Sequence, residues 1–313
     1  MGAIRGHSTL PMQFPGSFKN ATIELHGPAG AAWLKRLPYI LKQCEVRWSL
    51  KLESPFPNLT YNYAAPAKGP AGTRWVLKAG YPNPELTAEI EALRRFDGQG
   101  AVQLIKADPD LGLILLEELV PGIPLINLED DSQAASIAAG LMVQLRQPVP
   151  NPHHFRTVAD WFRGLKRLRT HFQGGSGPFP PELVERAESV SGELLASSVA
   201  DVLLHGDLHH TNILAAQRQP WLAIDPKGVV GEPAYEPSAF MHNPIPHLMQ
   251  SRYLKDILHR RADQFSKELE LDRSRLAGWA FAQAVLSAWW AYEDHGHGWE
   301  YFIACAEVLK GIA

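Results

Sequence analysis

The segment with the most specific chemical content is residues 203–214, which read LLHGDLHHTNIL. It contains a carboxylate, Asp207, and an amide, Asn212, in the order D-x-x-x-x-N. Transfer of a phosphoryl group needs a carboxylate beside the attacking hydroxyl and an oxygen ligand for the Mg²⁺ that binds the phosphates. We therefore predict that Asp207 accepts or orients the hydroxyl proton and that Asn212 binds the metal. His205 is predicted to hold the loop in place rather than to act as a base.

A second metal ligand is expected at the end of the β-hairpin that follows. Residues 221–225 read WLAID, an apolar strand that ends in Asp225. A metal ligand must be held rigidly, and a strand does so. A single Asp207 would more often be a turn or helix-capping residue. Here HGD, Asn212 and a strand-end acid agree in order and spacing, which favours the catalytic interpretation.

The same residues carry a family resemblance. HGDLHHTN has the spacing of the kinase loop H-R-D-x-x-x-x-N, with Gly206 in place of arginine. The run HGDLHHTNIL followed by AIDPKGVVGEPAYEPSAF resembles the aminoglycoside phosphotransferase superfamily, and residues 225–228 (DPKG) resemble its streptomycin kinase and hydroxyurea phosphotransferase branch. The likeness covers nearly the whole chain and includes Trp33-Leu34, Leu37-Pro38, Trp161-Phe162 and residues 286–289.

This resemblance implies a protein-kinase-like, two-lobed α+β fold. The β-rich N-terminal lobe, with one key helix, is expected at residues 1–118, and the larger, mainly helical C-terminal lobe at residues 119–313. The cofactors implied are ATP and Mg²⁺, and the implied partner is a small molecule that accepts phosphate on a hydroxyl.

Nucleotide contacts are expected in the N-terminal lobe. Lys78 ends the predicted strand RWVLK and resembles the lysine that binds the α- and β-phosphates. The family pattern places a glutamate four residues before a leucine, which selects Glu89, with Leu93, as the residue that positions Lys78. Glu91 lies on another face of the same predicted helix.

Of two further segments expected to meet nucleotide, one departs from the kinase pattern and one follows it. The turn between the first two predicted strands reads SPFPN, without G-x-G-x-x-G, so we expect its backbone N–H groups or the Ser54 hydroxyl to meet phosphate. A Walker A motif is absent from the sequence, which excludes a P-loop NTPase. Residues 117–120 (EELV) resemble the hinge whose backbone pairs with adenine, which assigns Glu117, Glu118 and Leu119 to the nucleotide.

Substrate contacts are predicted mainly in the C-terminal lobe. One of His209 and His210 is expected to face substrate or phosphate, and Lys227 to neutralise phosphate or to form an ion pair. Glu293 and Asp294 follow a run of aromatic residues and suit a polycationic substrate, although a solvated helix end is the simpler alternative. Other predictions are structural: an ion pair for Glu236, a solvated face for Arg163, Lys166, Arg167 and Arg169, and no metal site at His295 and His297.

Apolar periodicity and turn residues predict the elements that position these groups. Strands are expected at residues 48–52, 59–65, 74–79, 101–106 and 111–117, and a hairpin at 213–215 and 221–224. Helices are expected at 29–46, 86–96, around 137–145, after a capping box at 157–160, at 182–196, and from about 251 to the end.

Composition excludes several other classes of protein. The formal charge of −3 gives no basis for a nucleic-acid or membrane partner. Residues 1–10 lack an apolar run of signal-peptide length, and no stretch approaches 18 apolar residues, so we expect a cytoplasmic protein. Cys44 and Cys305 are expected to be reduced thiols.

Two functional hypotheses remain. The first is an O-phosphotransferase that uses ATP and Mg²⁺ on an aminoglycoside, aminocyclitol, hydroxyurea or sugar-like metabolite. The second is a catalytically weak nucleotide-binding module that regulates a partner, which the missing glycines favour but the complete set of predicted catalytic residues opposes. A protein-directed kinase is disfavoured because residues 225–236 are too few for a long activation loop. ATP or GTP as donor, and the oligomeric state, stay open.

Overall fold

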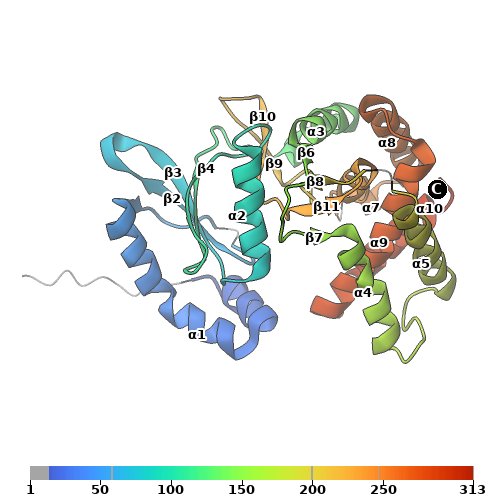
Figure 1. Ribbon diagram of the computed structural model, residues 1–313, viewed down its shortest axis with the longest axis horizontal. Coiled ribbons are helices and arrows are strands. Elements are labelled where there is room, and N and C mark those ends of the chain that lie inside the picture. The colour runs from blue at the N-terminus through green and yellow to red at the C-terminus, as the bar shows by residue number, and fades with distance from the viewer. Residues whose placement is uncertain (1–13, 58, 199, 246, 313) are drawn as a thin grey trace, which may run out of the picture. The chain divides into compact units, whose positions relative to one another are not determined.

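The computed structural model describes residues 14–57, 59–198, 200–245 and 247–312, and it separates into two compact units (Figure 1). The first unit takes the described residues up to Leu86 together with Ile105–Glu118, and the second takes Thr87–Leu104 and the described residues from Leu119 onward. Residues 1–10, in which the sequence shows no apolar run of signal-peptide length, and Asn58 lie outside the described residues.

The first unit is built on one five-stranded sheet with the order β1-β2-β3-β5-β4. Its strands are β1 (Lys51–Leu52), β2 (Tyr63–Lys68), β3 (Arg74–Ala79), β4 (Leu104–Asp108) and β5 (Leu113–Glu117). The prediction of five strands is confirmed, and β3 has the predicted bounds. The other strands differ by a few residues at their ends: β2, for example, begins at Tyr63 and continues through Pro66 to Lys68, beyond the predicted end at residue 65.

One long helix covers a face of this sheet. Helix α1 spans Gly16–Trp48, with a break at Gly27, where φ is +57°. The predicted helix 29–46 is therefore only its second part, and Trp48 ends the helix instead of beginning a strand. Apolar side chains of α1 pack against Leu77 and Leu115 of the sheet and form a core separate from that of the second unit.

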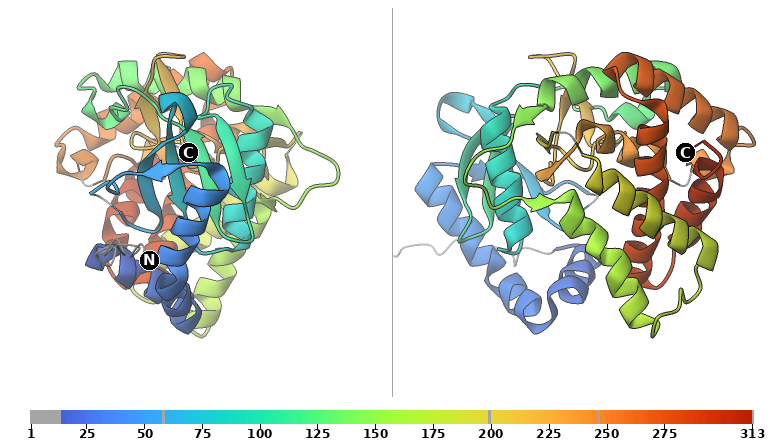
Figure 2. Two further views of the ribbon diagram at one scale, coloured as in Figure 1. Left: turned by 90° about the vertical axis from the view of Figure 1, so that its left-hand side faces the viewer. Right: turned by 45° about the vertical axis from the view of Figure 1, so that its right-hand side comes forward.

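The second unit is mainly helical, as predicted. Its long helices are α3 (Asp131–Leu145), α4 (Val158–His171), α5 (Pro181–Ala196), α8 (Leu254–Leu269), α9 (Arg273–His295) and α10 (Trp299–Leu309), with short helices α6 (Ser238–Met241) and α7 (His247–Gln250). Helix α2 (Pro84–Phe96) belongs to it from Thr87 onward. Residues 276–289 of α9 are all buried, and α4, α5, α8 and α10 pack around it (Figure 2).

Sequence patterns missed a small sheet in this unit. Its order is β6-β8-β11-β7, formed by Gln147–Pro148, Val202–Leu204, Val229–Gly231 and Arg156–Thr157. Strands of two or three residues are too short to show alternation. The predicted hairpin is confirmed as β9 (Ile213–Ala215) and β10 (Trp221–Ala223), and the predicted capping box is confirmed at the start of α4.

Two further sequence predictions can be compared with the structure. Cys44 and Cys305 are free, buried thiols, as expected. No helix among the described residues is both long enough and apolar enough to cross a membrane.

Candidate active site

The predicted catalytic loop begins where β8 ends, and the predicted metal segment ends where β11 begins. These two strands are antiparallel, with Val229 opposite Leu204. The end of one strand therefore lies beside the start of the other, and residues 25 positions apart become neighbours. The backbone N–H of Lys227 donates to the carbonyl of His205 at 2.8 Å. The small sheet thus brings the HGD loop and the DPKG segment together.

The hairpin β9–β10 brings Asn212 to the same place. Asn212 lies directly before β9, and Ile224 directly follows β10; the Ile224 N–H donates to the Asn212 carbonyl at 2.9 Å. Asp225 comes next and adopts φ +57°, an uncommon conformation for a residue with a side chain. Strained backbone of this kind is concentrated at functional sites.

The Asn212 side chain is oriented toward the predicted base. Its Nδ2 donates to the backbone carbonyl of Asp207 at 2.9 Å and lies 3.5 Å from the Asp207 carboxylate. Because these bonds fix which end of the amide is nitrogen, Oδ1 is the atom that would meet a cation. An amide oxygen and the Asp225 carboxylate are hard ligands of the kind that Mg²⁺ prefers.

The two oxygen donors of Asn212 and Asp225 suit Mg²⁺ better than they suit a metal ion whose ligands all come from the protein. Mg²⁺ is usually bound through one or two protein groups together with substrate phosphates and water. Among the described residues no cluster of three or more histidine, cysteine, aspartate or glutamate side chains forms a metal cage. The two histidines His295 and His297 stack on each other at 6.0 Å and belong to no such cluster.

His205 is the framework residue that the sequence predicted. It is fully buried, its Nε2 bonds the Ile224 carbonyl at 2.9 Å, and its Nδ1 accepts from the N–H of Asp207 at 3.2 Å. Burial lowers the pKa of His205 to about 4, so the ring is neutral at ordinary pH. A neutral ring with both nitrogens engaged ties β10 to the catalytic loop.

Glu236 holds the same loop from the other side. Its carboxylate accepts the backbone N–H groups of His205 at 2.8 Å and Gly206 at 2.9 Å. The predicted ion pair is therefore wrong, because the partners of this buried acid are peptide groups. Burial raises the pKa of Glu236 to about 7, against the opposing effect of these two hydrogen bonds. Glu236 thus orients the peptide groups that directly precede Asp207.

The two histidines of the loop have different surroundings. His209 is partly exposed, and its Nε2 lies 3.6 Å from the Asp207 carboxylate. His210 is buried and stacks on Phe240 with ring centroids 3.9 Å apart. Of the two, His209 lies beside the predicted base and His210 packs against Phe240, so we favour His209 as the histidine that faces substrate or phosphate, which stays a prediction.

Sequence reasoning missed the residue that supports His210. Arg261 of α8 is 1% exposed and lies 3.4 Å from His210 Nε2. It also donates to the Asp131 carboxylate and to three backbone carbonyls around α6. Its signal in the sequence is an arginine on the apolar side of an amphipathic helix, which is weak without the tertiary partners.

Helix α2 packs on the metal segment through a glycine. A Cβ at Gly228, where φ is +61°, would lie 3.0 Å from the Ala88 carbonyl and 3.1 Å from Ala92. The close approach therefore needs glycine. The adjacent residue on α2, Glu89, is buried. Lys78 is also buried, on the central strand β3 of the other unit, and its pairing with Glu89 stays a prediction.

The other residues predicted to bind nucleotide lie in the first unit or, for Leu119, at the start of the next segment of the second unit. Ser54 is exposed, but the Phe56 N–H of its turn donates to the Ala64 carbonyl, so this donor serves the sheet. The Glu118 carboxylate binds Arg74 at 2.6 Å. The chain leaves the first unit after Glu118, so Glu117 and Leu119 lie on either side of this passage.

The acidic pair at the end of α9 lies on the surface. Glu293 accepts two hydrogen bonds from Arg167, at 3.1 and 3.2 Å, and Asp294 is exposed. The basic run on α4 is partly paired, since Arg169 also binds Glu188 at 2.7 Å. Glu293 is therefore partly neutralised by its own protein.

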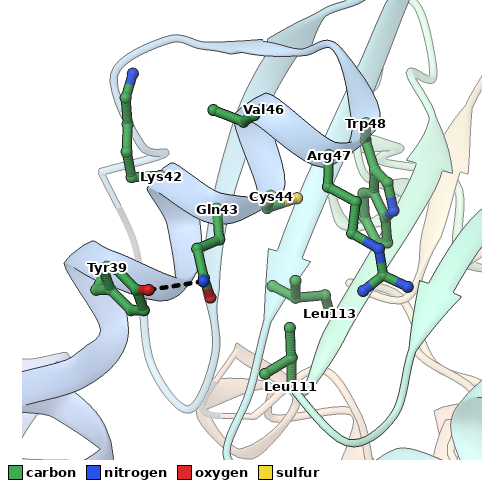
Figure 3. Close-up of a pocket in the computed structure, with 9 residues that line it drawn as sticks. All are labelled: Tyr39, Lys42, Gln43, Cys44, Val46, Arg47, Trp48, Leu111 and Leu113. Carbon is green, nitrogen blue, oxygen red and sulfur yellow. Dashed lines mark hydrogen bonds between the residues drawn. The ribbon is translucent and has the colours of Figure 1, made fainter.

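A hollow of about 420 Å³ in the first unit is a different feature (Figure 3). It lies between the end of α1 and the start of β5, where the Gln43 amide donates to the Tyr39 hydroxyl at 2.8 Å. Its lining residues are Tyr39, Lys42, Gln43, Cys44, Val46, Arg47, Trp48, Leu111 and Leu113. None of them was predicted to act in phosphoryl transfer, so we place the candidate site at the catalytic loop instead.

Comparison with solved structures defines the class of protein. Choline kinase LicA from Streptococcus pneumoniae superposes with a TM-score of 0.60 over 89% of this chain and 99% of its own, at 15% identity. An aminoglycoside phosphotransferase solved with ADP and hygromycin B gives 0.60 over 87% and 96%, at 12% identity. The fold is therefore that of the two-lobed, kinase-like phosphotransferases.

Sequence comparison identifies the family to which the chain belongs, which the shared fold does not. The family model for aminoglycoside/hydroxyurea antibiotic resistance kinases matches residues 61–295. Streptomycin 6-kinase of Streptomyces glaucescens is 33% identical over 287 residues, 91% of this chain and 93% of the relative. Hydroxyurea phosphotransferase of Kitasatospora aureofaciens is 31% identical over 305 residues, 96% of this chain and 87% of the relative. The chain belongs to this family and is a small-molecule phosphotransferase, as the motif predicted.

Proposed function

We propose that this phosphotransferase uses ATP and Mg²⁺ and transfers the γ-phosphoryl group to a hydroxyl of an aminoglycoside or aminocyclitol. The observation that supports this most directly is the convergence of Asp207, Asn212 and the Asp225 segment through the small sheet and the hairpin. Relatives that act on streptomycin and on hydroxyurea support a small acceptor.

In the proposed reaction Asp207 accepts a hydrogen bond from the acceptor hydroxyl and aligns its oxygen with the γ-phosphorus. A new O–P bond forms as the bond from the γ-phosphorus to the bridging oxygen breaks, and ADP leaves. The hydroxyl proton passes to the Asp207 carboxylate late, because the transition state is loose. Asn212 Oδ1 and the Asp225 carboxylate would hold Mg²⁺, which when bound would supply positive charge for the phosphates.

The other roles follow the family resemblance. Lys78 would bind the α- and β-phosphates, with Glu89 as its positioning residue, and Lys227 would neutralise charge during transfer. Peptide groups of residues 117–119 would pair with adenine, and the exposed Ser54 hydroxyl would meet phosphate. This makes residues 1–118 the nucleotide-binding lobe and residues 119–313 the catalytic lobe. We place the enzyme in the cytoplasm, where ATP is available.

The test is the variant Asp207→Ala, assayed with a panel containing streptomycin, hygromycin B, hydroxyurea and simple sugars. We expect turnover with the accepted substrate to fall at least ~10²-fold, the scale of a positioned acid–base group. Nucleotide affinity measured by calorimetry should be nearly unchanged, because Asp207 acts on the acceptor. Asp256→Ala, at an exposed position of α8, is the control and should match the wild type.

Each alternative result has a defined meaning. Unchanged turnover in Asp207→Ala would remove Asp207 from the chemistry. Loss of nucleotide binding together with turnover would make Asp207 a structural or metal-binding residue. Nucleotide binding by the wild type without transfer to any acceptor of the panel would favour the regulatory nucleotide-binding module.

A further inference from the structure

Two tryptophans from different helices meet beside the catalytic loop. The rings of Trp161 on α4 and Trp290 on α9 have centroids 5.7 Å apart and are nearly perpendicular, at 89°. They meet because Gly164 lets the helices approach: a Cβ there would lie 2.6 Å from Leu286 and 3.5 Å from the Trp290 indole nitrogen. Figure 1 shows these two helices next to each other within the second unit. We call these residues the Trp161–Trp290 pair.

This pair lies next to the predicted base. A Cβ on Gly206 would be 3.0 Å from Cη2 of Trp161, so the indole is in van der Waals contact with the residue that directly precedes Asp207. Tyr235 packs against the same indole, with ring centroids 6.0 Å apart. Burial, Glu236 and the negative charge of Asp207 raise the pKa of the Tyr235 hydroxyl well above its ordinary value. Trp161 thus contacts the residue next to Asp207 and packs on a tyrosine that feels the charge of Asp207.

The pair also differs from the other aromatic residues of these helices. Phe162, Trp279 and Trp289 are buried in the core, whereas Trp161 and Trp290 are each only partly buried. An indole at the edge of a core contributes apolar area and keeps part of its surface exposed. A π face beside a carboxylate attracts cations and the C–H face of a saturated ring.

We propose that the Trp161–Trp290 pair binds the ring of the acceptor and presents its hydroxyl to Asp207. The acceptor is then an amino-substituted sugar or cyclitol, since an acceptor of the size of hydroxyurea has no ring to cover the indoles. This inference rests on the proposed function, whose reaction it makes specific. It assigns substrate recognition to aromatic faces near the base, in addition to the exposed acids at the end of α9.

The experiment compares Trp161→Leu and Trp290→Leu with Trp161→Phe and with the control Trp299→Leu. Leucine keeps apolar volume but removes the π face, and phenylalanine restores part of it. Trp299, the first residue of α10, is also partly buried but packs against Phe179, with ring centroids 5.2 Å apart. The substrate is whichever ring-bearing acceptor of the panel the wild type phosphorylates best, and hydroxyurea is assayed beside it.

We expect KM for the ring-bearing acceptor to rise about five- to thirtyfold in both leucine variants, the range of a cation–π contact that is partly desolvated. The phenylalanine variant should recover part of this loss, and the control should show none. KM for ATP, and nucleotide affinity by calorimetry, should stay within about twofold because the pair does not contact nucleotide.

Two results would contradict the inference, and a third would refute the proposed function on which it rests. An unchanged acceptor KM in both leucine variants, with normal transfer by the wild type, would overturn the role of the pair and leave the proposed function intact. A wild type that prefers hydroxyurea to every ring-bearing acceptor would overturn the acceptor class. A wild type that phosphorylates nothing in the panel would instead refute the proposed function. If a leucine variant fails to bind ATP, the phenylalanine variant decides, and its acceptor KM must then exceed that of the wild type.

Discussion

Replacing Glu236 by glutamine tests whether burial or hydrogen bonding controls the acid that holds the catalytic loop. Glu236 is fully buried and accepts two backbone N–H groups, which favour the charged form. Burial and the nearby Asp207 disfavour that form, while Arg146 favours it. The net effect is a pKa of about 7, compared with an ordinary value of 4.5.

The magnitude follows from the linkage between protons and folding. Between pH 4.5 and about 7 the folded protein keeps a proton on Glu236 that the unfolded chain has released. The free energy of unfolding therefore falls as the pH rises through this window. A pKa that moves from 4.5 to about 7 corresponds to about 3 kcal/mol. Glutamine cannot ionise, so Glu236→Gln should avoid this loss with pH. Its amide NH2 cannot accept the second of the two backbone N–H groups, however, and this should cost the variant about 1–3 kcal/mol at every pH.

The assay is urea unfolding, followed by circular dichroism at pH 5, 6, 7 and 8. We expect Glu236→Gln to be less stable than wild type by about 1–3 kcal/mol at pH 5, and this deficit to shrink by up to about 3 kcal/mol by pH 8. Glu188→Gln removes a half-buried carboxylate elsewhere and keeps Glu236, so it should retain the fall in stability. A difference between Glu236→Gln and wild type that is constant with pH, or that grows in favour of wild type between pH 5 and pH 8, would refute the reasoning.

The other predictions concern single positions. Gly206→Ala should lower the free energy of unfolding, measured by urea unfolding, by about 2–5 kcal/mol, because φ is +83° and the new Cβ would lie 2.7 Å from Val229. The control Gly192→Ala lies in mid-helix with open space around it and should be neutral or stabilising in the same assay. Thr157→Ala should cost about 1 kcal/mol in the same assay, since it removes the capping box of α4, and a loss below the error would make the cap irrelevant. Asp225→Asn should reduce Mg²⁺-dependent turnover more than ~100-fold with the fold intact; full activity across a Mg²⁺ titration would remove Asp225 from the metal site.

Local patterns predicted the elements that depend on short stretches of chain. Strand β3, the hairpin β9–β10 and the capping box at Thr157 appear where alternation, turn residues and the T-x-x-D pattern placed them. Helix α1 begins earlier than predicted because the chain continues as helix on both sides of the break at Gly27. The β6-β8-β11-β7 sheet was missed because its strands are stabilised by partners distant in sequence.

The properties of the candidate site also divide into those that local sequence patterns predicted and those that only the structure revealed. By itself the sequence determined which residue types lie in the loop and their spacing, because D-x-x-x-x-N and the strand-end acid are local patterns. Only the tertiary structure decided that Glu236 binds peptide groups of the loop, that His210 is buried on Phe240, and that Trp161 contacts Gly206. These contacts join residues that lie about 30 to 45 positions apart in the sequence. Helix and strand periodicity spans only a few residues and therefore cannot predict them. Burial and long-range pairing therefore set the properties of the site that spacing alone does not specify.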